Sequence, residues 1–376
     1  MTIGFDAKRL FRNFTGLGNY SRFVVQALKE HFPQNQYYLF TPSIKLNPDT
    51  QPFLSAPYHV VAPGGIMKKL HPLWRSVGMS FSKGASGLDI YHGLSQELPY
   101  FLPEKVKKIV TVHDLIFYRY PQYYNPLDVL IYKKKLKSAC ARAHRIVAIS
   151  RQTAQDLQAF LHIDPDKISV VYQGFHPQFS AKQSPSRLEE VRQLYNLPAN
   201  YLLCVGTIEP RKNAGILVEA LSRLSPPVRM PLVLVGRQTA YAGQVLKRAE
   251  ELNVRHLVLI RDKVAFAHLP AIYQGAAVFL YPSVFEGFGI PVIEGIGSGV
   301  PVISSTGSCF AEAGGPDTMY VSPADAVAWA EAISTVLNNE NLRQQMVRNS
   351  QQYINRFKPE NIARELMNIY SELLNQ

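Results

Sequence analysis

Short runs of β-branched and other apolar residues recur along almost the whole chain, separated by segments with the apolar spacing of a helix. In the first half they read TIGFD, YYLF, YHVVA, LDIYHG, KIVTVHD, RIVAIS and ISVVYQG. In the second half they read YLLCVG, PLVLVG, LVLI, AAVFLYP, VPVIS and TMYVS. Strands that are apolar along their whole length are typical of parallel sheets covered by helices on both faces. The pattern therefore predicts an α/β protein with two successive doubly wound parallel sheets.

A stretch with prolines and serines, FHPQFSAKQSPSRLEE, separates the two sets of strands and is the best candidate for a linker. The chain of 376 residues is long enough for two domains, each with its own core. We expect an N-terminal Rossmann-like domain over 1–180 and a C-terminal one over 181–357, facing a central cleft at the carboxyl ends of their strands. Residues 358–376 have the spacing of an amphipathic helix, which we expect to pack back on the N-terminal domain.

The composition is that of a globular protein, with 47% hydrophobic and 18% charged residues. There is no run of 18 apolar residues, and the start MTIGFDAKRL lacks the apolar core of a signal peptide, so we expect a cytoplasmic protein. Cys140, Cys204 and Cys309 are far apart and lack metal-ligand spacing. We expect each of them to be a small buried hydrophobe.

The positive charge is concentrated in the first half of the chain. Residues 1–180 contain 22 Lys and Arg against 11 Asp and Glu, whereas residues 181–376 contain 18 against 17. In the densest parts, 66–83 and 132–145, basic residues alternate with large apolar ones. Such segments are compatible with an anionic membrane surface, and equally with solvated helix faces. We expect no nucleic-acid partner.

The stretch FEGFGIPVIEGIGSGVPVI places Glu286 and Glu294 around a glycine-rich turn and a short helix. Pro291 suits the first turn of that helix. Strand, glycine turn, helix and strand follow one another, an arrangement that leaves backbone N–H groups free to bind an anion. A carboxylate accepts hydrogen bonds from neighbouring hydroxyls, as in a sugar. The spacing alone equally allows Glu286 to cap the helix and Glu294 to be solvated on its outer face.

Three further strand ends carry candidate residues. Gly16 and Gly18 precede a helix and could let a phosphate or sugar approach closely, although glycine turns are common. His113 could donate to a sugar hydroxyl as a neutral imidazole, while Asp114 more simply caps the next helix.

In the segment GTIEPRKN, Arg211 and Lys212 directly precede a helix that is predicted to start around Asn213. Two fixed positive charges beside helix N–H groups suit a diphosphate. The alternative is a surface salt bridge of Arg211 with Glu209.

The segments TGLGNYSR, GTIEPRKN, LVLVGR and YPSVFEGFGIPVIEGIGSGVPVISS together resemble glycosyltransferase family 4, the retaining enzymes of GT-B fold, and especially its mannosyltransferase-like bacterial branch. The resemblance covers essentially the whole chain, and the block with both glutamates is its most specific part. It implies transfer of a hexose from a nucleotide sugar, GDP-mannose or a UDP-sugar, to a glycan or polyprenyl-linked acceptor in bacterial surface polysaccharide synthesis. It also implies that the enzyme needs neither a metal ion nor a cofactor and that the protein lies at the inner face of the membrane.

The resemblance implies a role for each group. Glu286 would lie by the transferred sugar, Glu294 would bind the ribose hydroxyls, Lys212 would neutralise the diphosphate and His113 would contact the donor sugar. Three further groups would bind the donor. Lys263 and Val264 would lie by the base, and the others are Gly16, Gly18 and Arg211 and the turn Phe288, Gly289 and Ile290.

The chain departs from the family at Thr207, where many members have an arginine, and Arg211 is the candidate substitute. Two alternatives remain. A nucleotide-sugar 2-epimerase has the same two doubly wound domains, although the block EGFGIPVIE argues against it, and a non-catalytic protein that binds nucleotide sugars could have kept the donor site.

Overall fold

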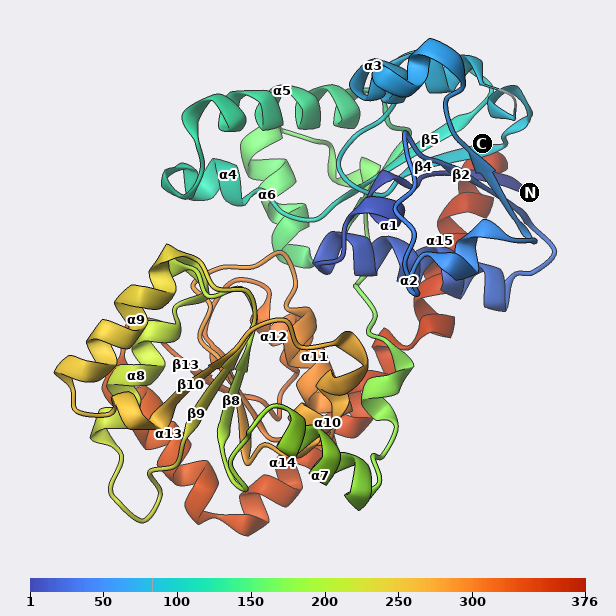
Figure 1. Ribbon diagram of the computed structural model, residues 1–376. Helices are drawn as coiled ribbons and strands as arrows, with labels where there is room; N and C mark the ends of the chain where they lie inside the picture. Colours follow the sequence, from blue (N-terminus) through green and yellow to red (C-terminus); the bar gives the residue numbers. More distant parts are fainter. Residues whose placement is uncertain (83) are drawn as a thin grey trace. The chain divides into compact units, whose positions relative to one another are not determined.

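The structure of the chain is a computed structural model that describes residues 1–82 and 84–376. It divides into an N-terminal unit, Met1–Gly174 with Phe357–Gln376, and a C-terminal unit, Phe175–Arg356. Each unit is a parallel sheet with helices on both faces (Figure 1). Both sheets of the predicted GT-B fold are thus present.

The boundary between the units lies earlier than the predicted position 180/181. Phe175 packs against Gly297, and the buried ring of Phe179 lies edge-on to that of Tyr273. Because these two aromatic side chains are in the core of the C-terminal unit, the first part of the expected linker belongs to that unit.

The N-terminal sheet has seven strands in the order β3-β2-β1-β4-β5-β6-β7, and the pairs are parallel. The strands are β1 (Thr2–Asp6), β2 (Gln36–Phe40), β3 (Tyr58–Val61), β4 (Ile90–Gly93), β5 (Lys107–Val112), β6 (Arg145–Ala148) and β7 (Ile168–Val170). The order reverses between β1 and β4, which is the topological switch point of this sheet.

The α-helices of this unit are α1 (Lys8–Arg12), α2 (Gly16–His31), α3 (His71–Ser76), α4 (Ile116–Arg119), α5 (Pro126–Arg142), α6 (Arg151–Leu161) and α15 (Pro359–Leu374). Helix α15, at the red end of the chain in Figure 1, packs against α2. Its Tyr370 hydroxyl lies 2.6 Å from Nδ1 of His92, which is buried in β4. The last helix is therefore part of the N-terminal core.

The C-terminal sheet has six strands in the order β10-β9-β8-β11-β12-β13, again in parallel pairs. They are β8 (Leu202–Val205), β9 (Leu232–Val235), β10 (Val258–Arg261), β11 (Val278–Tyr281), β12 (Val302–Ser305) and β13 (Met319–Val321). Here the switch point lies between β8 and β11, where Leu202 is paired with Val278.

The α-helices of this unit are α7 (Pro185–Leu194), α8 (Ala214–Arg223), α9 (Ala240–Glu251), α10 (Leu269–Gln274), α11 (Ile290–Gly297), α12 (Phe310–Gly314), α13 (Ala326–Asn338) and α14 (Glu340–Tyr353). Helices α8, α9 and α13 cover one face of the sheet, while α7, α10, α11 and α12 lie on the other (Figure 1). In the part of the chain that is described, no helix has the length and hydropathy needed to span a membrane.

Candidate functional site

The loops that follow β8 and β11 meet at the switch point of the C-terminal sheet. The backbone N–H of Val284 donates to the carbonyl of Arg211 at 2.9 Å, and the side-chain amide of Asn213 donates to the carbonyl of Pro282 at 3.2 Å. Ligands of doubly wound sheets bind at this position, beyond the carboxyl ends of the strands on either side of the switch point.

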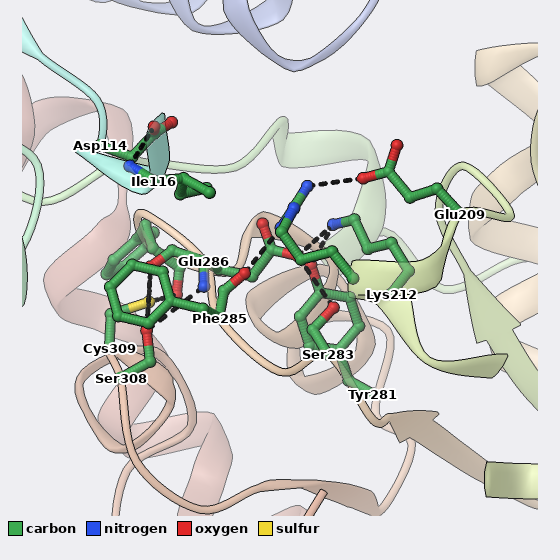
Figure 2. Close-up of polar contacts among 12 residues, drawn as sticks. Asp114, Ile116, Glu209, Lys212, Tyr281, Ser283, Phe285, Glu286, Ser308 and Cys309 are labelled. Carbon is green, nitrogen blue, oxygen red and sulfur yellow. Dashed lines mark hydrogen bonds and ion pairs between the residues drawn. The ribbon is translucent and has the colours of Figure 1, made fainter. Parts of the chain in front are cut away.

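Glu286 is the centre of an ion-pair cluster in these loops (Figure 2). Its Oε1 accepts from Lys212 Nζ at 2.5 Å, from Arg211 Nη1 at 2.7 Å and from Ser283 Oγ at 2.8 Å. Each of these three donors comes from the loop after β8 or the loop after β11. The carboxylate therefore ties the two loops together.

Other groups fix the two cations of this cluster. Lys212 Nζ donates to the hydroxyl of Tyr281 at 2.7 Å. Arg211 donates to the carbonyl of Phe285 and to Oε1 of Glu209, each at 2.7 Å. Arg211 thus pairs with Glu209, as the salt-bridge alternative expected, but it pairs with Glu286 as well.

The cluster consists of two cations and two carboxylates, and the charges of Glu286 and Arg211 stabilise each other. Burial by itself would raise the pKa of Glu286, but Lys212 and Arg211 lower it to about 2. Burial also opposes the charge of Arg211, yet its pKa is raised because Glu286 and Glu209 more than compensate. An ionised Glu286 can accept hydrogen bonds but cannot donate them.

Two residues that the sequence did not assign to the site hold the backbone beside Glu286. The Ser308 hydroxyl donates to the carbonyl of Glu286 at 3.0 Å, and the Cys309 thiol donates to the carbonyl of Phe288 at 2.8 Å. Burial raises the pKa of Cys309 well above its usual value, so the thiol stays protonated and can donate. Cys309 is therefore a hydrogen-bonding anchor of this loop, in addition to being buried.

The two glutamates differ from the structural alternatives given for them. The N-cap residue of α11 is Gly289, and the carboxylate of Glu286 pairs with Lys212 and Arg211. Glu294 is only 7% exposed and is not solvated on an outer face. Its Oε2 accepts from the hydroxyl of Tyr273 at 3.1 Å, and burial raises its pKa to about 7.

The turn before α11 has a backbone conformation that glycine favours. Gly289 has a φ of 112°, where an L side chain would be strained. The side chain of Phe288 is buried, so this residue could meet a ligand only through its backbone. The first amides of any helix have no intrahelical acceptor, which makes the start of α11, Ile290 included, suitable for an anion.

Lys263 and Val264 follow β10 at the same edge of the sheet, and β9 separates β10 from β8. Lys263 is exposed and has a positive φ of 54°. These two residues thus follow a strand end on the same side of the sheet as the Glu286 cluster.

His113, at the end of β5, belongs to the N-terminal unit and is buried. Its Nε2 donates to the carbonyl of Leu94 at 2.8 Å, and its Nδ1 accepts from the side-chain amide of Gln173 at 3.1 Å. Burial lowers its pKa to about 4, which favours the neutral ring. Both ring nitrogens have protein partners, which the sequence did not indicate.

The glycines of the N-terminal loop lie inside a helix rather than before it. Gly16 and Gly18 are both in the first turn of α2, so the predicted helix start is wrong. A Cβ on Gly18 would lie 1.7 Å from the carbonyl oxygen of Asn13, whereas nothing lies within 4 Å of one on Gly16. Gly18 is thus required for packing, and Gly16 leaves open space at the start of the helix.

Asp114 lies just before α4, but the N-cap residue of that helix is Leu115, which makes no side-chain cap hydrogen bond. Oδ1 of Asp114 accepts from the backbone N–H of Ile116 at 3.1 Å, at the start of α4 (Figure 2).

Among the described residues, no group of three or more His, Cys, Asp and Glu side chains could hold a metal ion. The sequence has one Asp-X-Asp spacing, Asp164 to Asp166. There Oδ1 of Asp164 accepts from the backbone N–H of Asp166 at 3.0 Å, so this pair forms a turn before β7.

Two family models match the chain, one in each half. The model described as Glycosyltransferase Family 4 matches residues 16–179, and the model described as Glycosyl transferases group 1 matches residues 188–353.

The chain is similar along most of its length to curated bacterial proteins. It is 28% identical to the O-antigen chain mannosyltransferase B of Escherichia coli over 293 residues, which are 76% of this chain and 74% of that protein. It is 27% identical to the O-antigen chain mannosyltransferase RfbU of Salmonella typhimurium over 235 residues, which are 62% of each protein. The match thus spans less than two thirds of RfbU.

Among solved structures, Anabaena HepE in complex with UDP-glucose superimposes with a TM-score of 0.76. This match covers 99% of the present chain and 100% of that one at 17% identity, and it shows that the two proteins share a fold.

Proposed function

Because the chain belongs to glycosyltransferase family 4 and has the GT-B fold, we propose that it is a retaining hexosyltransferase that uses a nucleotide sugar as donor. The acceptor would be a glycan or a polyprenyl-linked glycan in bacterial surface polysaccharide synthesis. The two O-antigen mannosyltransferases support mannose as the hexose, and the donor that we propose is GDP-mannose. A UDP-sugar is the alternative, since the solved structure of HepE contains UDP-glucose.

The observation that supports this proposal best is the Glu286 cluster at the switch point, followed in the same segment by the buried Glu294. Lys212 and Arg211 would bind the diphosphate, and the first amides of α11 would contribute further donors. Glu286 would accept from hydroxyls of the transferred sugar and Glu294 from those of the ribose. His113 would lie by the sugar, and Lys263 with Val264 by the base.

The chemical barrier would be the separation of charge between an oxocarbenium-like sugar and the departing diphosphate. Lys212 and Arg211 would stabilise the negative charge that develops on the leaving group, an effect of roughly 3 to 4 kcal/mol for one well-placed donor. The acceptor would attack from the face that the diphosphate leaves, so that the anomeric configuration is retained. We assign this stabilisation of the leaving group to the side chains of Lys212 and Arg211, so the proposed mechanism requires no metal ion.

Binding of a diphosphate would change the partners of the cations. In the present structure each cation already pairs with Glu286. The phosphate oxygens would compete with the Oε1 atom for Lys212 and Arg211, which would release this atom for the sugar hydroxyls. Donor binding would thereby prepare the carboxylate that contacts the sugar.

A thermal-shift panel of nucleoside diphosphates and nucleotide sugars tests the donor. A ligand at a hundred times its dissociation constant adds about 2.7 kcal/mol to the free energy of unfolding. We expect GDP and GDP-mannose to raise the melting temperature most. Stabilisation by UDP compounds alone would contradict the choice of donor, and no stabilisation by any of these compounds would contradict the donor site.

A product analysis then separates the possible activities. A glycosyltransferase is expected to hydrolyse the donor slowly when no acceptor is present and to transfer the sugar when the acceptor is present. Release of the free 2-epimer would indicate an epimerase, and binding without turnover would indicate a non-catalytic protein.

A further inference from the structure

Four buried polar side chains form a continuous series of contacts across the N-terminal unit, from α15 to α2. The Tyr370 hydroxyl of α15 lies 2.6 Å from Nδ1 of His92 in β4, and Nε2 of the same ring lies 2.8 Å from the Thr111 hydroxyl in β5. The Thr111 hydroxyl in turn lies 3.1 Å from the hydroxyl of Tyr20 in α2. Each of the four residues is at most 3% exposed, and we call them the buried network.

The buried network is built from groups that are uncharged at neutral pH. Burial, and then the nearby His113, lower the pKa of His92 to about 3, which favours the neutral ring. Burial raises the pKa of Tyr20 to about 12, so its phenol keeps the hydrogen. A neutral imidazole has one donor and one acceptor nitrogen, and each hydroxyl can both donate and accept. Every contact of the network can therefore join a donor to an acceptor.

The buried network reaches His113 through Tyr20. The ring centroids of Tyr20 and His113 are 4.7 Å apart and the ring planes are at 88°, so the two rings pack edge to face. The nitrogens of His113 are held by the carbonyl of Leu94 and by the side-chain amide of Gln173. Tyr20 is thus a third neighbour that fixes the orientation of this ring.

Hydrogen bonds fix the side chain of Tyr20 more exactly than apolar packing would. Apolar contacts are non-directional, whereas a buried hydroxyl that moves away from its partner leaves two polar groups unsatisfied. A movement at one residue of the network would also disturb the next, because His92 and Thr111 each join two neighbours. The position of Tyr20 in α2 therefore depends on Tyr370 in the last helix of the chain.

We propose that the buried network positions the ring of His113, just after β5, for its contact with the donor sugar. Tyr20 acts on His113 directly, and the other three residues act through Tyr20. They are positioning residues rather than catalytic ones, and through Tyr370 the last helix supports the sugar site. The inference deepens the proposed function, on which it rests for the place of His113 by the sugar.

The first test observes His113 without any substrate. In protein with isotope-labelled histidine, the ring signals of His113 are assigned by their absence from the magnetic resonance spectrum of His113→Gln. We expect Thr111→Val, which keeps the shape of the side chain but removes its hydroxyl, to shift these signals. Thr111→Ser keeps the hydroxyl and should show the parental signals. Tyr370→Phe should also shift them, and it is the milder variant because it removes one contact instead of two.

The second test measures transfer. Thr111→Val should lower kcat at least about tenfold, because a small displacement of a group at the reacting centre can cost about 100-fold in rate. The KM for the nucleotide sugar should change much less, since the groups that we assign to the diphosphate belong to the C-terminal unit. Thr111→Ser should have the parental kcat.

Tyr37→Phe is the matched control for the loss of a buried hydroxyl. The Tyr37 hydroxyl donates to the carbonyls of Leu28 and Phe32 at 2.8 Å each, in the same unit but outside the buried network. This variant should lower the melting temperature as the network variants do, while the His113 signals and kcat stay parental.

The outcomes separate a failure of the network from a failure of the proposed function. Unchanged His113 signals in Thr111→Val and Tyr370→Phe would overturn the inference, as would an equal shift in Tyr37→Phe. If the His113 signals shifted in both network variants but kcat stayed parental, the network would position the ring, and the place of His113 by the donor sugar would be wrong.

Discussion

Lys212 Nζ lies 2.5 Å from Oε1 of Glu286, although the two residues follow different strands of the C-terminal sheet. The cation that we assign to the diphosphate is thus held by the carboxylate that we assign to the sugar. Burial of both groups makes the loss of either partner costly, because an unpaired charge would remain. The two side chains must therefore be tested separately.

Lys212→Met should weaken binding of the nucleoside diphosphate. The substitution keeps most of the side-chain length but removes the charge, and a lost contact to a largely buried phosphate costs about 2 kcal/mol or more, which is about 30-fold in affinity. Calorimetry measures it, with Lys247→Met on the exposed side of α9 as the matched control. Equal affinity of Lys212→Met and the parent would contradict the assignment to the phosphate.

Glu286→Gln, unlike Lys212→Met, should not weaken binding of the nucleoside diphosphate, but it should slow transfer strongly. Lys212 and Arg211 lose a competing anion, so affinity for the nucleoside diphosphate should be retained or increased. Transfer should fall at least about 100-fold, or about 2.7 kcal/mol in activation free energy, because the sugar loses a charged acceptor. Single-turnover transfer and calorimetry measure the two effects. Transfer at the parental rate would remove Glu286 from the sugar site.

Most of the fold was predictable because parallel strands covered on both faces are apolar along their whole length. In the described part of the chain, each predicted apolar run contains a strand, from β1 to β13. The helix α11 was also predictable, since Pro291 lies in its first turn. The unit boundary was placed too late because Phe175 and Phe179 pack with residues much later in the sequence.

The side-chain partners within the site were not predictable from local sequence. Tyr273 is bound to Glu294 and Tyr281 to Lys212, but nothing in their own segments distinguishes these tyrosines from core residues. The partners of His113 likewise come from two distant segments. Strand ends indicate which loops meet, whereas the pairing of side chains within those loops depends on tertiary packing.

The affinity for GDP-mannose should depend on pH through Glu294. Burial raises the pKa of this carboxyl to about 7, and only its ionised form accepts from both ribose hydroxyls. Affinity should therefore fall about tenfold between pH 8 and pH 6. A nucleotide sugar is the suitable probe, because its diphosphate does not titrate in this range. Glu294→Gln should bind GDP-mannose more weakly, and its affinity should not change with pH in this way. If the affinity changed equally with pH in both proteins, another group would be responsible for the pH dependence.

Glu294 should also make the unliganded protein less stable as pH rises. Its folded pKa lies above its usual value of 4.5, so between these values the folded chain binds more protons than the unfolded chain. The contribution of this group to the free energy of unfolding then decreases from about pH 4.5 to about pH 7. Denaturant titrations at several pH values give the free energy of unfolding of the parent and of Glu294→Gln. The slope of this free energy against pH should differ between the two proteins over that range. The same slope in both proteins would contradict the raised pKa.

Chelation of divalent cations should leave transfer intact. Lys212 and Arg211 already supply two fixed positive charges at the switch point, which is the role that a metal would have at the diphosphate. The measurement is the initial rate with excess EDTA, compared with the rate after Mg²⁺ is added. A strict requirement for the cation would contradict the metal-independent mechanism.

Arg211 should take the place of the arginine that many family members have at the position of Thr207. Thr207 and Lys212 line the same small hollow after β8. Arg211 precedes Lys212 in this loop, and its guanidinium pairs with Glu209 and Glu286. Arg211→Met should therefore lower affinity for the nucleoside diphosphate about tenfold, less than the change at Lys212. Thr207→Arg in the Arg211→Met background should restore most of the loss, because it returns one guanidinium to the same strand end. If the double variant bound the nucleoside diphosphate as weakly as Arg211→Met alone, a charge at 207 would not reach the diphosphate. If Arg211→Met bound it as tightly as the parent, the role of Arg211 would be limited to its ion pairs with the two glutamates.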